Sequence, residues 1–159
     1  MCIRDSNYTS FTTPSSVIDF DMDTMEKNIL KKTEVVDESF KESNYVSERI
    51  FAESHDGVMI PISIVRHVDT ELSESTPLLL YGYGSYGITN DPRFSSTRLS
   101  LLNRGFVYAT AHIRGSEYYG RKWYEDGKLF KKKNTFFDFV ACAKPVSYTH
   151  LRAHETLVH

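Results

Sequence analysis

The sequence predicts an α/β fold, and three features lead to that prediction. Residues 77–82 and 106–113 are short unbroken apolar runs, as expected of strands that are covered on both faces. Residues 98–105 have a helical pattern closed by their last residue, a glycine. Asn134 is a suitable N-terminal cap for a further helix through residues 136–143. The order strand, helix, strand, helix favours a parallel sheet with helices packed on it.

The residues before this region have strand patterns. In residues 16–22, Ile18, Phe20 and Met22 share one face, which is typical of a half-buried strand, and residues 28–36 return as a second strand. Two or three strands are not stable alone. They therefore belong either to a larger β-structure or to a β-meander of the domain that follows the polar linker, residues 37–44.

A hairpin is predicted next, because residues 45–54 and 58–67 flank the pair Asp56-Gly57, and both residue types tolerate the positive φ of a tight turn. Pro61 confines the second strand of this hairpin to an edge or near-edge position.

Composition excludes several classes of function. The 159 residues include 19 Lys and Arg against 21 Asp and Glu, and a net charge of −2 gives no footprint for nucleic acid or an anionic membrane. No apolar run reaches the length of a membrane span, and the N-terminus has no secretory signal, so a cytoplasmic location is expected.

Both ends of the chain differ from the rest. Residues 1–6 (MCIRDS) and 145–159, which contain VSYTHLRAHET, resemble translated adapter or cloning sequence and are left out of the fold prediction. A metal site at the C-terminal histidines is then not expected. Cys142 is left without a partner for an internal disulfide.

The glycines at positions 82, 84 and 87 fit G-x-G-x-x-G directly after a strand, which would be typical of dinucleotide binding. Two features disfavour it. No helix follows the loop at once to hold a pyrophosphate, and no acidic residue stands in residues 106–110, about 20 positions later, to bind a ribose. A nucleotide-binding domain and a non-catalytic interaction domain remain the lesser alternatives.

Residues 77–87 (PLLLYGYGSYG) and 106–144 closely resemble the start of the catalytic domain of the prolyl oligopeptidase family of serine peptidases, and oligopeptidase B within it. The resemblance extends over residues 7–144. It implies the end of a β-propeller over residues 7–40 and the first half of an α/β-hydrolase domain over residues 41–144.

The same resemblance implies an activity and a site. Tyr83 is expected to donate its hydroxyl to the oxyanion, and Tyr86 to line the pocket for the residue before the scissile bond. Gly82 and Gly84 let the backbone pass close to substrate. Short peptides would be cleaved after Arg or Lys, without metal or organic cofactor.

The chain has no G-x-S-x-G nucleophile elbow. The resemblance places the elbow, the acid and the histidine downstream, so an inactive fragment is expected, whose partner is the remainder of its own catalytic domain and propeller. The strand at residues 77–82 would then keep an unpaired edge, and the chain would self-associate.

Other polar residues of the region are expected to be structural. Arg114 matches a family I-R-G-G segment, in which Ser116 replaces a glycine, and is expected to organise its loop by ion pairing. The acidic residues near it in sequence are Glu117, Glu125 and Asp126.

His112 is expected to be a satisfied core residue. A triad of His112, Asp126 and either Ser85 or Ser116 is rejected, because neither serine lies in an elbow. The lysines at 128 and 131–133 are expected to lie on a solvated loop before Asn134.

Overall fold

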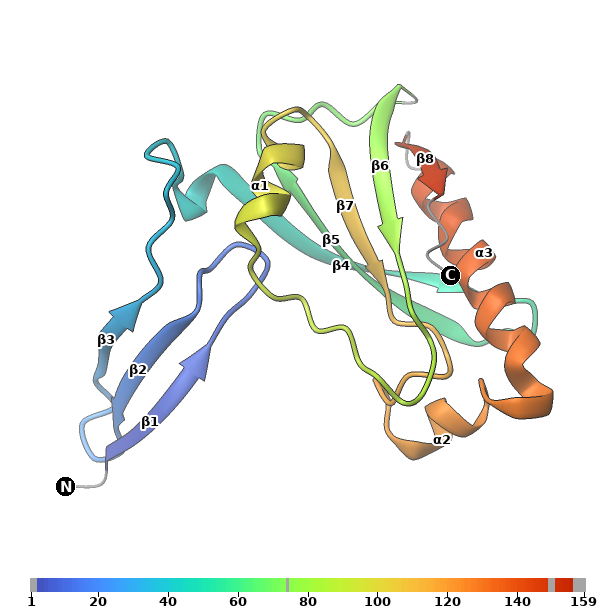
Figure 1. The fold of residues 1–159 in the computed structure, drawn as a ribbon, viewed down its shortest axis with the longest axis horizontal. Helices are drawn as coiled ribbons and strands as arrows, with labels where there is room; N and C mark the ends of the chain where they lie inside the picture. The colour runs from blue at the N-terminus through green and yellow to red at the C-terminus, as the bar shows by residue number, and fades with distance from the viewer. Residues whose placement is uncertain (1–2, 74, 149–150, 156–159) are drawn as a thin grey trace.

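The computed structural model describes the backbone of residues 3–73, 75–148 and 151–155, and the side chains of residues 6–73 and 75–143. These residues form two separate sheets (Figure 1). The first is antiparallel, in the order β1 (Ile3–Tyr8), β2 (Ser16–Asp21), β3 (Lys27–Lys32). The second has the order β4-β5-β7-β6-β8, with bounds β4 Tyr45–Glu53, β5 Met59–His67, β6 Thr76–Tyr81, β7 Val107–Ala111 and β8 Leu151–Glu155.

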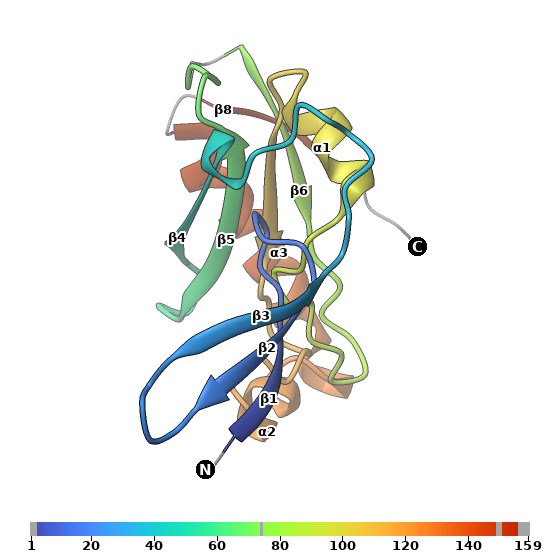
Figure 2. The ribbon, with the colours of Figure 1, turned by 90° about the vertical axis from the view of Figure 1, so that its left-hand side faces the viewer.

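Three α-helices and two short 3₁₀ turns complete the described fold: α1 Ser96–Leu102, α2 Arg121–Glu125, α3 Lys132–Tyr148, η1 Glu42–Asn44 and η2 Leu129–Lys131. Figures 1 and 2 show α1 and α3 beside the larger sheet. The two helices bury separate sets of apolar side chains. Phe139 and Cys142 of α3 pack with Ile62 and Leu80 of the sheet, whereas Leu99 and Leu102 of α1 join a second cluster.

The larger sheet is mixed, so the predicted parallel sheet is correct only for its second half. Strands β6, β7 and β8 are parallel, but β4, β5 and β7 pair antiparallel. The cause is the predicted hairpin between β4 and β5. Of the two turn residues, only Gly57 has a positive φ (+79°), whereas the prediction allowed for one at Asp56 as well. The Gly57 N–H donates to the carbonyl of Ser54 at 3.0 Å. Pro61 accordingly lies in β5, the strand next to the edge.

Strand β6 differs from prediction in two ways. Its residues alternate between buried and half-buried, so only the face with Leu78 and Leu80 is fully covered. Its outer edge is also paired, because β8 lies parallel to it in register Leu78↔Ala153. The expected unpaired edge is therefore wrong: after α3 the chain returns along β6, and its backbone supplies the missing hydrogen-bonding groups. The foreign origin of residues 1–6 and 145–159 stays a prediction.

Local chemistry predicted the end of α1 and the start of α3, and only the first of these two predictions is confirmed. Gly105 (φ +81°) closes α1, with the N–H of Gly105 bonded to Leu102 and that of Phe106 to Leu101, the Schellman pattern. Asn134 is not the N-cap of α3. Because η2 runs directly into the helix, α3 begins two residues earlier, and the Asn134 amide donates to the Asp126 carbonyl at 2.9 Å.

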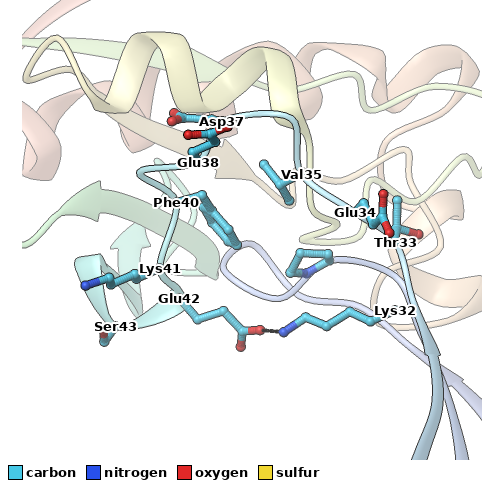
Figure 3. A pocket seen from close by; sticks show the side chains of 11 residues that line it. Lys32, Thr33, Glu34, Val35, Asp37, Glu38, Phe40, Lys41, Glu42 and Ser43 are labelled. Carbon is cyan, nitrogen blue, oxygen red and sulfur yellow. Dashed lines mark hydrogen bonds and ion pairs between the residues drawn. The ribbon is translucent and has the colours of Figure 1, made fainter.

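The two sheets meet around the segment predicted as a linker. Strand β3 ends at Lys32, earlier than predicted, and Phe40 then packs on Tyr45 and Phe94 with ring centroids 5.6 and 5.3 Å away. A hollow of about 720 Å³ lies on this segment, and Figure 3 shows Lys32 and Glu42 joined beside it. The hollow is not lined by any residue that the sequence analysis singled out as functional.

Candidate active site

Two loops meet at the carboxyl ends of β6 and β7, where parallel α/β sheets usually place their sites. They are residues 82–95 and 112–120, and they meet at the lower end of the sheet in Figure 1, near α2, before the first loop runs back to α1. The Gly87 N–H donates to the Gly115 carbonyl at 3.0 Å, and the Glu117 N–H donates to the Gly87 carbonyl at 3.2 Å. The first loop is therefore fixed on the second by backbone hydrogen bonds.

Glycine is required where these loops cross. Gly84 and Gly115 both have positive φ, +59° and +95°. A Cβ on Gly115 would lie 2.1 Å from the Gly84 carbonyl oxygen, and a Cβ on Gly84 would lie 2.5 Å from a methyl carbon of Thr135. Neither space admits a side chain, so the glycine spacing serves loop packing.

The two candidate tyrosines lie on this loop and face solvent to different degrees. Tyr83 is 42% exposed, and its hydroxyl makes no hydrogen bond within the described part of the chain. Tyr86 is 82% exposed and takes a left-handed backbone conformation, φ +55°, which is costly for a residue with a side chain. Tyr86 also lines a cavity of about 330 Å³ with Ser85, Tyr124 and Lys132.

Lys132 is a site residue that the sequence analysis missed. Its ammonium donates to the Gly84 carbonyl at 2.6 Å and to the Ser85 hydroxyl at 2.7 Å, and burial lowers its pKa. The prediction of a solvated loop is wrong for this lysine, because it lies in the first turn of α3, beside the tyrosine loop. Of its neighbours, Lys131 pairs with Asp126 at 2.7 Å and Lys133 is exposed.

Arg114 holds its loop through a buried ion-pair network, with partners other than the acidic residues near it in sequence. Its guanidinium donates twice to Asp138, at 2.8 and 2.6 Å, and to both oxygens of Asp56, at 2.6 and 3.1 Å. Arg114 is 3% exposed and Asp138 is fully buried. The hydrogen bonds to Asp138 raise the pKa of Arg114, and the hydrogen bonds from Arg114 lower the pKa of Asp56.

Glu117, Glu125 and Asp126 bond elsewhere. Glu117 and Glu125 pair with Arg121, whereas Asp126 pairs with Lys122 and Lys131. The network of Arg114 instead joins the β4–β5 turn, the loop after β7 and the middle of α3, which are far apart in sequence.

His112 is a buried core residue, 2% exposed. Its Nε2 lies 2.8 Å from the Ser63 hydroxyl, its ring stacks on Tyr118 at 3.9 Å, and burial lowers its pKa to about 4. Ser116 instead donates to the Ile113 carbonyl at 2.8 Å. The structure brings none of the rejected triad residues together around this imidazole.

The described residues offer little for a cofactor. Helix α1 begins only at Ser96, well after Gly87, so the glycine loop does not run directly into a helix as the dinucleotide-binding fingerprint requires. Within the described ranges, no three His, Cys, Asp or Glu side chains gather as a metal site. None of the helices in the part of the chain that the structure describes could cross a membrane.

The fold and the glycine-tyrosine loop define the N-terminal part of an α/β-hydrolase domain, preceded by strands of a β-propeller. Residues 92–158 match the profile of the Prolyl oligopeptidase family. Over these residues the chain is similar to members of that family.

Named relatives agree with that placement. The chain is 47% identical to Dipeptidyl aminopeptidase BI of Pseudoxanthomonas mexicana, over 84% of this chain and 18% of that protein. It is 42% identical to Protease 2 of Moraxella lacunata, over 86% of this chain and 20% of that protein. Oligopeptidase B from Leishmania major superposes with a TM-score of 0.84 at 39% identity, over 95% of this chain and 22% of that structure. The chain thus spans about a fifth of the length of these relatives.

Proposed function

We propose that this chain is part of a serine peptidase that cleaves short peptides through an acyl-enzyme, and that Tyr83 is its oxyanion donor. The observation that carries the proposal is the half-exposed side chain of Tyr83, whose hydroxyl has no hydrogen bond among the described residues, on a loop held by backbone hydrogen bonds at the carboxyl end of β6. Residues 7–40 would be the end of the propeller and residues 41–144 the first half of the peptidase domain.

In the reaction, the hydroxyl oxygen of a nucleophilic serine, which this chain does not supply, attacks the scissile carbonyl. A histidine takes the proton of that serine. The carbonyl oxygen then gains negative charge. Tyr83 donates its O–H to that oxygen, and the hydrogen bond is stronger in the transition state than in the substrate. The oxyanion then re-forms the carbonyl as the amine leaves with the proton held by the histidine. Water attacks the acyl-enzyme in the same way and releases the serine.

Tyr86 would form a wall of the pocket for the side chain before the scissile bond. Its high exposure leaves the ring accessible to substrate, and the cavity beside it is also lined by Tyr124. A preference for Arg or Lys at this position rests on the likeness to oligopeptidase B.

The exposed face of α3 supports a partner within the same protein. Phe136, Phe137 and Val140 are 57%, 46% and 52% exposed. Large exposed apolar side chains on one helix are typical of a surface that another element covers. The proposed cover is the remainder of the catalytic domain.

The proposed function predicts opposite results for the short and the long protein. Purified residues 1–159 should not react with a serine-directed fluorophosphonate, because the chain has no nucleophile elbow. A full-length peptidase that carries this segment should be labelled once and should cleave after Arg or Lys in preference to Pro. Mass spectrometry of the labelled peptides measures the labelling of both proteins, and hydrolysis of peptides that carry Arg, Lys or Pro before the scissile bond measures the preference. Stoichiometric labelling of any serine in residues 1–159, or an unlabelled full-length protein, would contradict the proposal.

A further inference from the structure

One face of α3 holds the loop that carries Tyr83. Lys132, Thr135 and Phe139 are spaced i, i+3 and i+7, so they lie on the same side of the helix. Lys132 donates to the Gly84 carbonyl, and a methyl group of Thr135 lies against the Gly84 position. A Cβ added to Gly82 would lie 3.0 Å from the ring of Phe139. The helix therefore contacts the residues on both sides of Tyr83.

The contact of Lys132 differs from the other two because it is a charged hydrogen bond in a partly buried place. Both of its described acceptors, the Gly84 carbonyl and the Ser85 hydroxyl, are uncharged oxygens. Holding an ammonium there without a carboxylate is less favourable than pairing it, whereas charge-assisted hydrogen bonds are strong and directional. The main effect of this arrangement is therefore to restrain the Gly84–Ser85 peptide, and not to stabilise the lysine.

Backbone rotation at the Gly84–Ser85 peptide would affect the direction of the Tyr83 side chain. Gly84 follows Tyr83 and has φ +59°, in a region where glycine alone moves easily. Tyr86 is held at φ +55°, so the loop conformation is not the one that its sequence prefers. Without a restraint on the Gly84 carbonyl, the direction of the Tyr83 side chain would vary with the rotation of its neighbour.

We propose that Lys132 is a positioning residue for the oxyanion site: its ammonium fixes the Gly84–Ser85 peptide and thereby the hydroxyl of Tyr83. The proposal rests on the function proposed for Tyr83 and adds a residue that does not itself touch substrate. Lys132 acts through the loop, and its loss should affect the transition state more than substrate binding.

The test is a double-mutant cycle in a full-length peptidase that carries this segment. Lys132→Met should lower kcat/KM by about tenfold to a hundredfold, mainly in kcat, because a misplacement of about 1 Å can cost that much. In the Tyr83→Phe background the same change should cost less than about twofold, because the hydroxyl that it positions is already absent. Lys133→Met is the matched control, since Lys133 is adjacent on α3 and exposed.

The outcomes separate the two proposals. An equal loss from Lys132→Met with and without the Tyr83 hydroxyl, or a loss no larger than that of Lys133→Met, would overturn the role of Lys132. A Tyr83→Phe variant with full activity would instead overturn the proposed function, whatever Lys132 does. If Lys132→Met does not fold, Ser85→Ala removes one acceptor without changing the helix. Its smaller loss should also vanish in the Tyr83→Phe background, and persistence of that loss there would contradict the proposal.

Discussion

Replacing Tyr83 with phenylalanine is expected to lower kcat/KM of a full-length peptidase carrying this segment by about one to three orders of magnitude. The physical reason is the loss of one donor aimed at the developing oxyanion, which costs up to about 4 kcal/mol of transition-state stabilisation. Steady-state kinetics on a peptide substrate measure the effect. Most of it should appear in kcat, because the hydrogen bond strengthens as charge develops.

Thermal stability should change little in the same variant, since the Tyr83 hydroxyl has no hydrogen bond within the described residues. Tyr119→Phe is a matched control, because Tyr119 lies on the neighbouring loop, is 54% exposed and packs on Trp123. A loss below about threefold for Tyr83→Phe, against the loss typical of a removed donor, would mean that Tyr83 only packs.

Replacing Asp138 with asparagine is expected to lower the free energy of unfolding by about 3 to 5 kcal/mol. Removing one partner of a buried ion pair leaves the other charge without compensation, and that charge is costly to bury. Here the affected group would be Arg114, which is 3% exposed and, among the described residues, would keep Asp56 as its one carboxylate partner and the Ser54 hydroxyl at 3.4 Å. Urea unfolding of the full-length protein gives the change as a shifted midpoint at constant slope.

Asp126→Asn provides the comparison for that experiment. Asp126 pairs with Lys122 and Lys131, whose side chains are 86% and 60% exposed, and these pairs lower its pKa to about 2. Exposed pairs contribute less than about 1 kcal/mol. An Asp138 variant that unfolds at the same urea concentration as the Asp126 variant would show that the buried network does not stabilise the loop.

Local patterns predicted most of the elements. Alternation located β2, the pair Asp56-Gly57 located the hairpin of β4 and β5, the unbroken apolar runs located β6 and β7, and Gly105 located the end of α1. Each of these signals depends on neighbours within a few residues. The start of α3 was misplaced because Asn134 has the chemistry of a cap, yet its amide bonds to the carbonyl of Asp126 from inside the helix.

The parts that could not be predicted depend on contacts between distant residues. The hydrogen bonds of Arg114 span 24 residues to Asp138 and 58 residues to Asp56. The contact of Lys132 with Gly84 spans 48 residues. A lysine in a basic run has the sequence signature of a solvated surface, and only the packing of α3 against the tyrosine loop identifies its role.

The most direct test is a crystal structure of a full-length peptidase carrying this segment, with a peptide aldehyde ending in arginine bound to its serine. The adduct places an oxygen where the oxyanion forms. The Tyr83 hydroxyl should lie 2.7–3.1 Å from that oxygen, within the range typical of an oxyanion donor, while Lys132 still contacts the Gly84 carbonyl. A Tyr83 hydroxyl directed away from the adduct, with other donors around the oxygen, would contradict the proposed site.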